Sequence, residues 1–301
     1  MLAKFQAAWN KFWFAPVSPA PVCLFRILLG ILALVDGLLW CPDFLTWYGN
    51  DAVLSYESLR YFDNGFSVLL LHHFSDQQIY GLLALYLIAC VFVIVGFCSR
   101  TSLFLLWLLS VSISHRDPPI WHQASLLVRL YSFTMIFAPS AAMYSVDAWI
   151  KKFRAQSEKS KLYAPFAQRL LQFQVTCIYW RAFFGKIQGG TWLNGTAVYW
   201  TLHHTNVVRH TVPAFFDHLW FYNIMTYYTL VIEFLMWTII WVPPFNKAVL
   251  LGALFLHGGI EWFVNLDLLE WAVVISYVLF LVPEDIERFM LKVGRLLPRS
   301  N

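Results

Sequence analysis

The stretch from Cys177 to His204 reads C-I-Y-W-R-A-F-F-G-K-I-Q-G-G-T-W-L-N-G-T-A-V-Y-W-T-L-H-H. It begins as the end of an apolar helix, and Lys186 lies at the terminus of that helix, just before the break at Gly189-Gly190. A lysine that is held out of water can lose its charge and act as a base. The other interpretation is a lysine that extends to the lipid headgroups, as lysines do at many ends of membrane helices. The two interpretations differ in whether Lys186 has a chemical role.

The composition indicates an integral membrane protein. Of 301 residues, 59% are hydrophobic, 19% are aromatic and 13% are charged, and the mean hydropathy is +0.60. In a soluble domain about a quarter of the residues are charged. The net charge is +4, and no segment is basic or acidic enough to indicate nucleic-acid binding. The five cysteines include no C-x-x-C pair, which argues against a disulfide framework and against a thiol-redox site.

A membrane-spanning helix needs about 20 mostly apolar residues. Eight stretches meet or approach this length, and they are 21–40, 78–97, 101–115, 121–139, 166–187, 223–242, 246–264 and 267–283. We therefore predict an all-α fold, a polytopic membrane bundle of about eight transmembrane helices. No repeat, low-complexity tract or linker interrupts the chain, so residues 1–301 are predicted to form a single transmembrane domain.

The distribution of Lys and Arg predicts the orientation of this bundle. The loop 140–165 is rich in basic residues, and the N-terminus and the C-terminal tail fall on its side of the membrane. Under the positive-inside rule both termini are cytoplasmic. Residues 3–13 and 284–297 are predicted to be amphipathic helices on the inner surface. The loops 41–77 and 188–222 are aromatic-rich, belong to the outer face and have the length of lids or binding elements.

Ionisable residues inside membrane spans usually have a partner or a function. Six fall inside the predicted spans: Arg26, Asp36, Arg129, Arg181, Glu233 and His257. Structural pairing is expected for Arg26, Asp36 and Arg181. Glu233 and His257 lie at similar depth on adjacent spans, so we predict a hydrogen bond between them. Such a pair suits core packing and proton transfer equally.

His122 begins the fourth predicted span from the outer side, at about the depth of Lys186. Lys186, His122 and Glu261 are therefore expected to line one outward-facing cavity. The alternative for His122 is an interfacial residue beside Trp121.

No metal site is predicted. His72-His73 and His203-His204 are adjacent pairs, and adjacent residues on a helix diverge by about 100°. No spaced carboxylate or cysteine joins either pair, so neither has the ligand spacing of a metal centre.

Several pieces of the chain, taken in order, resemble one family. They are L-F-R-I-L-L-G (24–30), V-G-F-C-S-R (95–100), W-H-Q-A-S-L-L (121–127), S-V-D (145–147), I-Y-W-R-A-F-F-G-K-I-Q-G-G-T-W-L-N-G (178–195), Glu233 and F-L-H (255–257). Together they resemble the HTTM (horizontally transferred transmembrane) domain, the membrane portion of vitamin K-dependent gamma-carboxylase and of its short bacterial relatives. The resemblance implies a multi-pass protein of the bacterial cytoplasmic membrane.

The resemblance also implies a chemistry. Lys186 would be the catalytic base and His122 its catalytic partner, acting on vitamin K hydroquinone or another quinol. Trp192, His257, Glu233, Arg129 and Tyr179 would bind that cofactor. Two features depart from the carboxylase: Ile187 follows Lys186 where the carboxylase has a second lysine, and the chain ends at 301 without the large lumenal region. Carboxylation of a recognised precursor is therefore not expected.

Two functions follow as hypotheses. The first is a membrane enzyme of a carboxylase- or epoxidase-like kind. Its lysine base would act on a quinol-like lipid, and the enzyme would modify a secreted peptide or another substrate at the outer face. The second is a non-catalytic membrane protein that assists peptide-toxin maturation or export, as SdpB-type relatives do. The bilayer and a secreted peptide are the expected partners. The enzyme requires Lys186 and His122 to face a common cavity, whereas a scaffold does not.

Overall fold

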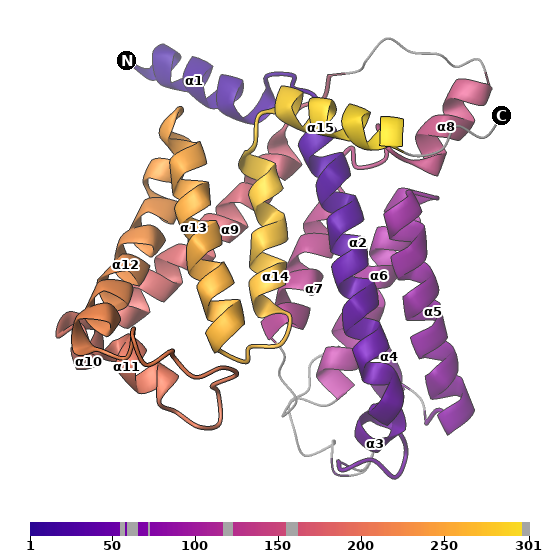
Figure 1. The fold of residues 1–301 in the computed structure, drawn as a ribbon. Helices are drawn as coiled ribbons and strands as arrows, with labels where there is room; N and C mark the ends of the chain where they lie inside the picture. Colours follow the sequence, from indigo (N-terminus) through magenta and orange to yellow (C-terminus); the bar gives the residue numbers. More distant parts are fainter. Residues whose placement is uncertain (55–57, 59–65, 72, 117–122, 155–161, 297–301) are drawn as a thin grey trace. The chain divides into compact units, whose positions relative to one another are not determined.

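The computed structural model describes residues 1–301 except 55–57, 59–65, 72, 117–122, 155–161 and 297–301. In this part of the chain every regular element is a helix, apart from two isolated bridges between Val17 and Tyr163 and between Val208 and Val264. The predicted all-α class is therefore confirmed (Figure 1). The helices form two compact units: residues 1–170 with 281–301 (unit 1), and residues 171–280 (unit 2).

Unit 1 contains the first four predicted spans. Its helices are α1 (Leu2–Phe14), α2 (Ala20–Trp40), η1 (Cys41–Asp43), α3 (Phe44–Tyr48), α4 (Val68–Leu71), α5 (Asp76–Val95), α6 (Ser99–Arg116), α7 (Gln123–Met135), α8 (Val146–Phe153), the start of α9 (Phe166–Lys186) and α15 (Pro283–Leu296). The helices α2, α5 and α6 start and end close to the predicted boundaries because apolar runs and flanking Pro or Gly residues mark them.

Small residues let α2 and α5 pack closely. A side chain at Gly30 would lie 2.7 Å from Ile94, and one at Gly37 would lie 2.6 Å from Tyr86. The hydroxyl of Tyr86 donates to the backbone carbonyl of Ala33 at 3.2 Å. These contacts bring two apolar helices together backbone to backbone, which is a common way for membrane helices to associate.

A buried arginine joins α2 to the end of α5. Arg26 donates to the carbonyls of Val93 at 2.7 Å, Ile94 at 3.2 Å and Tyr144 at 2.6 Å. The first two are among the last carbonyls of α5, which lack partners within the helix. Gly96 ends α5 with a φ of +70°, a conformation that glycine adopts without a steric cost.

The beginning of α6 is held at the same end of unit 1. The carboxylate of Asp147 accepts hydrogen bonds from the backbone N–H groups of Cys98 at 2.8 Å and Ser99 at 3.0 Å. These are the free N–H groups of a helix start, where a negative charge is favourable.

The two predicted surface helices are confirmed as helices at that end of unit 1. There α1, α8 and α15 all lie at the end of unit 1 where α2 begins (Figure 1), and Ser18 donates to Glu287 of α15 at 2.6 Å. The third surface helix, α8, carries Lys151 and Lys152 in its last turn. The part of unit 1 that is predicted to face the cytoplasm therefore gathers at one end.

Unit 2 contains the rest of the predicted spans. Its helices are the remainder of α9, α10 (Gly190–Leu193), α11 (Ala197–Leu202), α12 (Leu219–Trp237), η3 (Ile239–Trp241), α13 (Phe245–Phe263), α14 (Leu269–Val274) and η4 (Ile275–Phe280). Gln172 of α9 donates to the carbonyl of Leu279 at 2.7 Å, and Phe183 of α9 packs on Phe234 of α12. The helix α9 therefore contacts both α12 and η4.

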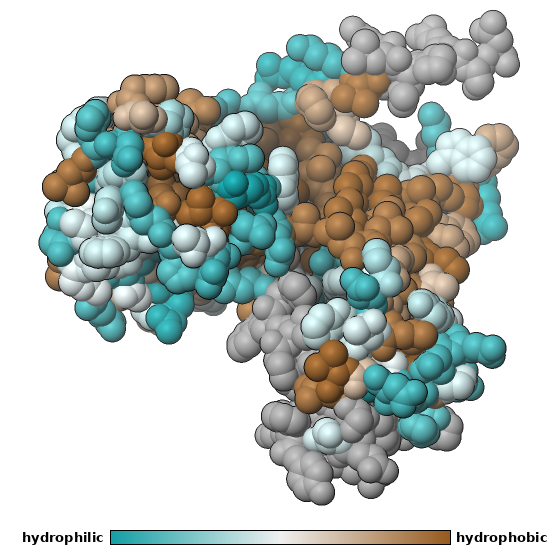
Figure 2. All heavy atoms as spheres, turned by 60° about the horizontal axis from the view of Figure 1, so that its bottom comes forward, coloured by the Kyte–Doolittle hydropathy of each residue, from teal (hydrophilic) through white to brown (hydrophobic). Residues whose placement is uncertain are grey.

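Two helical segments of the described residues are long and apolar enough to cross a membrane: Ala20–Tyr48 and Asp76–Val95. Figure 2 shows the band of hydrophobic side chains that α2 and α5 expose. The other predicted spans exist as helices but depart from this pattern. The helix α7 has only 13 residues, and α9 carries Gln168, Arg169, Gln172 and Gln174 in its first half. An eight-span bundle and a single domain therefore stay predictions.

Candidate functional site

Lys186 is the last residue of α9. Its ammonium donates to the Oε1 atom of Glu233 on α12 at 2.6 Å. The lysine side chain is 27% exposed and the glutamate side chain is 8% exposed. A positive charge at a helix C-terminus also interacts favourably with the helix dipole. Lys186 is therefore neither a free surface lysine nor an isolated buried amine, but half of an ion pair.

A short turn carries an aromatic ring to the same lysine. The chain turns after Lys186, and the carbonyl of Gly189, the residue before α10, accepts a hydrogen bond from the N–H of Trp192 at 3.0 Å. The Nζ atom of Lys186 lies 5.2 Å from the centre of the Trp192 ring. A cation at this distance from an indole face is attracted by the ring electrons. The Gly189-Gly190 break of the sequence thus serves to bring Trp192 back to Lys186.

The second carboxylate oxygen of Glu233, Oε2, does not take part in the ion pair. In the described part of the chain Oε2 of Glu233 is buried and has no hydrogen-bond partner. A buried acceptor without a partner costs free energy, about 1–3 kcal/mol for a neutral group and more for a charged one. Unpaired polar atoms of this kind often mark a place where a ligand or water binds.

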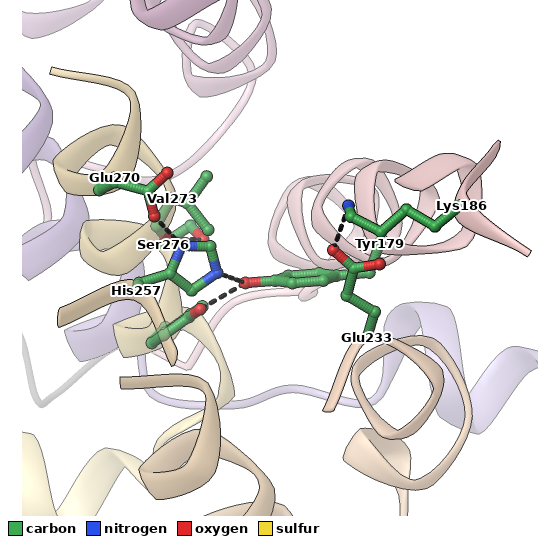
Figure 3. A network of polar contacts seen from close by, with 8 residues as sticks. Tyr179, Lys186, Glu233, His257, Glu270, Val273 and Ser276 are labelled. Atoms are coloured by element: carbon green, nitrogen blue, oxygen red, sulfur yellow. Dashed lines mark hydrogen bonds and ion pairs between the residues drawn. The ribbon is translucent and has the colours of Figure 1, made fainter. Parts of the chain in front are cut away.

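A second polar cluster lies deeper in unit 2 (Figure 3). The hydroxyl of Tyr179 on α9 lies 2.6 Å from Nε2 of His257 on α13 and is also hydrogen-bonded to the hydroxyl of Tyr277 in η4. The other imidazole nitrogen, Nδ1, contacts the carboxylate of Glu270 on α14. Four elements therefore contribute one residue each to a continuous chain of hydrogen bonds.

The predicted hydrogen bond between Glu233 and His257 is wrong. Oε1 of Glu233 binds Lys186, while His257 uses both of its ring nitrogens for Tyr179 and Glu270. The prediction was based on depth along the spans, and depth does not specify which side of a helix a residue occupies. Glu261, expected beside Lys186, instead binds Arg209 through Oε1 at 2.8 Å.

A family model described as HTTM domain matches residues 14–284, which is nearly the whole chain. The chain belongs to the HTTM domain family. The HTTM chain is accordingly a membrane protein related to the gamma-carboxylase and SdpB-like proteins of that family. No curated protein and no solved structure matches it.

Five of the seven residues named from the HTTM sequence lie in unit 2: Lys186, Trp192, Glu233, Tyr179 and His257. Arg129 belongs to unit 1, where its Nη1 atom lies 3.4 Å from Nε2 of His115 and its Nε donates to the carbonyl of Ser125 at 3.4 Å. His122 lies outside the described residues. Its pairing with Lys186 therefore stays a prediction.

Two residues of the polar cluster in unit 2, Glu270 and Tyr277, were not predicted from the sequence. Glu270 lies within the predicted eighth span 267–283, and a carboxylate in such a span is itself a signal of function. Tyr277 carries no charge and lies in a mostly aliphatic stretch, so the sequence alone contains no signal for it.

The geometry allows two kinds of proton chemistry. The Lys186–Glu233 pair joins a lysine amine to a carboxylate at 2.6 Å, and the second carboxylate oxygen, Oε2, is a free acceptor atom among the described residues. The Tyr179–His257–Glu270 chain has a histidine with a carboxylate that orients it, which is the arrangement of a general base. Among the described residues no group of three or more His, Cys, Asp or Glu side chains is arranged to hold a metal ion.

Proposed function

We propose that this HTTM protein is a membrane enzyme that removes a proton from the hydroxyl group of a quinol-like lipid, with Lys186 as the base and Glu233 as its partner. One observation carries the proposal: the buried Oε2 atom of Glu233 has no hydrogen-bond partner in the described chain, beside an ion-paired lysine. The enzyme would act within an eight-span bundle, on the outer side of the bacterial cytoplasmic membrane.

The residues around the ion pair fit a hydroxylated aromatic ring. Oε2 of Glu233 is a free acceptor for a hydroxyl donor. Trp192 offers a flat aromatic surface close to Lys186, and aromatic rings stack favourably on one another. The exposed faces of Trp180 and Phe184 on α9 are apolar, which suits the hydrocarbon tail of a lipid.

The ion pair allows Lys186 to act as the base. In a medium of low dielectric constant a pair of charges is penalised by desolvation. When the shared proton lies on Glu233, Lys186 becomes a neutral amine with a free lone pair and can accept a proton. A bound quinol would supply an acidic hydroxyl group, and Lys186, as ammonium, would then stabilise the negative charge beside it.

The test is binding and oxygen-dependent consumption of vitamin K hydroquinone by the full-length protein in lipid nanodiscs. Lys186→Arg keeps a positive charge for Glu233 but cannot become neutral. We expect it to bind the quinol within about threefold of wild type and to lose at least about 100-fold in turnover, the usual loss for a proton-transfer group. Lys186→Ala should lose both.

Lys247→Ala is the matched control, because Lys247 also belongs to unit 2 but lies at the other end of α13 from His257. It should bind and turn over as wild type does. Undiminished turnover in Lys186→Ala would remove this residue from the chemistry. Absence of both binding and turnover in the wild type would favour the alternative, a non-catalytic HTTM protein that assists the maturation or export of a secreted peptide.

A further inference from the structure

We infer that Tyr179, His257, Glu270 and Tyr277 form a second, independent proton-binding site of unit 2, which takes up one proton on His257 by reversing the two hydrogen bonds of the Tyr179 hydroxyl. The ligand of this site is the proton alone. The inference does not rest on the proposed function, because the state of the site can be measured without any substrate.

The first argument is burial. The exposed fractions are 3% for Tyr179, 4% for Tyr277, 8% for His257 and 4% for Glu270. A carboxylate in such a place costs several kcal/mol unless a positive charge accompanies it. The polar side chain that contacts Glu270 is the imidazole of His257. A proton added to His257 therefore converts a buried net charge into a neutral pair.

The second argument is the assignment of a donor and an acceptor to each hydrogen bond of the cluster. With a neutral imidazole, Nδ1–H donates to Glu270, so Nε2 must accept from the hydroxyl of Tyr179. The oxygen of Tyr179 can then accept from Tyr277. Every contact in the cluster has one donor and one acceptor in this arrangement.

The same contacts also accommodate one proton more. With a proton from solvent on Nε2, this nitrogen donates to the oxygen of Tyr179, and the Tyr179 hydroxyl turns to donate to Tyr277. Glu270 keeps its contact with Nδ1. No heavy atom has to move, because a phenolic hydroxyl rotates about its C–O bond.

Among the residues that the structure describes, four charged or titratable groups face His257. They are Tyr179 from α9, Glu270 from α14 and Tyr277 from η4, and Glu233 from α12, which interacts electrostatically with His257 and Glu270 through space. Glu233 has its own cation in Lys186. The remaining negative charge, that of Glu270, is the one that the added proton balances.

The experiment uses the full-length protein with ¹⁵N-labelled histidine in lipid nanodiscs, and NMR spectra recorded from about pH 5 to about pH 9, the range in which histidine charge changes are usually found. A His257→Gln spectrum assigns the signal. We expect the two ring nitrogens of His257 to change from one protonated to both protonated as the pH falls. The ring-carbon signal of Tyr179 next to the hydroxyl should shift in the same step.

Two variants separate this site from its surroundings. In Glu270→Gln there is no carboxylate to balance, so His257 should stay neutral over the whole range. In Lys186→Ala the step should persist, because Lys186 belongs to the other pair. A His257 that stays neutral in the wild-type protein at every pH would overturn the inference, as would a Glu270→Gln protein that titrates as wild type does.

Discussion

The two residues of the ion pair, Lys186 and Glu233, differ in how far each is exposed to solvent. The lysine is 27% exposed and the glutamate only 8%, so the lysine can turn toward water and the glutamate cannot. An exposed ion pair contributes little to stability, whereas a buried charge that loses its partner is costly. The two partners should therefore differ in what their loss does to the protein.

This difference predicts an order of stabilities. Lys186→Met leaves a buried carboxylate without its cation, and Glu233→Gln leaves an ammonium that can reach water. We expect Lys186→Met to lower the free energy of unfolding by at least about 1 kcal/mol more than Glu233→Gln. Unfolding in detergent with increasing denaturant measures both. The double variant should recover part of the loss, since the two sites are coupled; equal losses in the two single variants would contradict the argument.

At the level of elements, the end of α5 illustrates how a buried side chain and a glycine depend on each other. Arg26 fills the space above Gly96, and a Cβ at that glycine would lie 2.0 Å from Nη1 of Arg26. The backbone of Gly96 is also left-handed, with a φ of +70°. Any side chain there would be strained by its own backbone and would displace the guanidinium.

Two glycines near the same helix provide a matched comparison. Gly96→Ala should destabilise the protein by at least about 2 kcal/mol, since it combines an unfavourable φ with the loss of hydrogen bonds from a charged group. Gly81 lies within α5 with nothing near its Cβ position, and Gly81→Ala should stabilise by up to about 1 kcal/mol. Thermal unfolding of both variants tests this. A Gly96→Ala protein as stable as wild type would show that the arginine is not held as described.

For the molecule as a whole, the sequence predicted where helices lie much better than which side chains meet. The predicted spans coincide with α2, α5, α6, α7, α9, α12, α13 and the pair α14–η4, because apolar runs between Pro and Gly residues mark helix ends directly. The break after Lys186 was likewise visible in Gly189-Gly190. The partners of the polar side chains were not visible in the sequence. Glu233 binds Lys186 and His257 binds Glu270 because of how each helix is rotated about its axis, and hydropathy does not encode this rotation.

The predicted orientation of the molecule can be tested on a native cysteine. Cys98 is exposed, in the turn between α5 and α6, on the side that is predicted to be cytoplasmic. In a variant that retains only Cys98, a membrane-impermeable maleimide should label inverted vesicles and not intact cells or right-side-out vesicles.

The control for this labelling is a variant that retains only Cys41, which follows α2 at its opposite end. It should show the reverse preference, although its partial burial will slow the reaction. Labelling of Cys98 from outside would reverse the predicted orientation of unit 1.

The contacts of Arg26 have a consequence for how the family can diverge. Its guanidinium donates hydrogen bonds to the main-chain oxygens of residues 93, 94 and 144. Atoms of the main chain are the same whatever residue carries them, so substitutions at Ile94 or Tyr144 preserve these contacts while a substitution at Arg26 abolishes them. Over evolutionary time the arginine should remain fixed while the side chains at positions 94 and 144 drift.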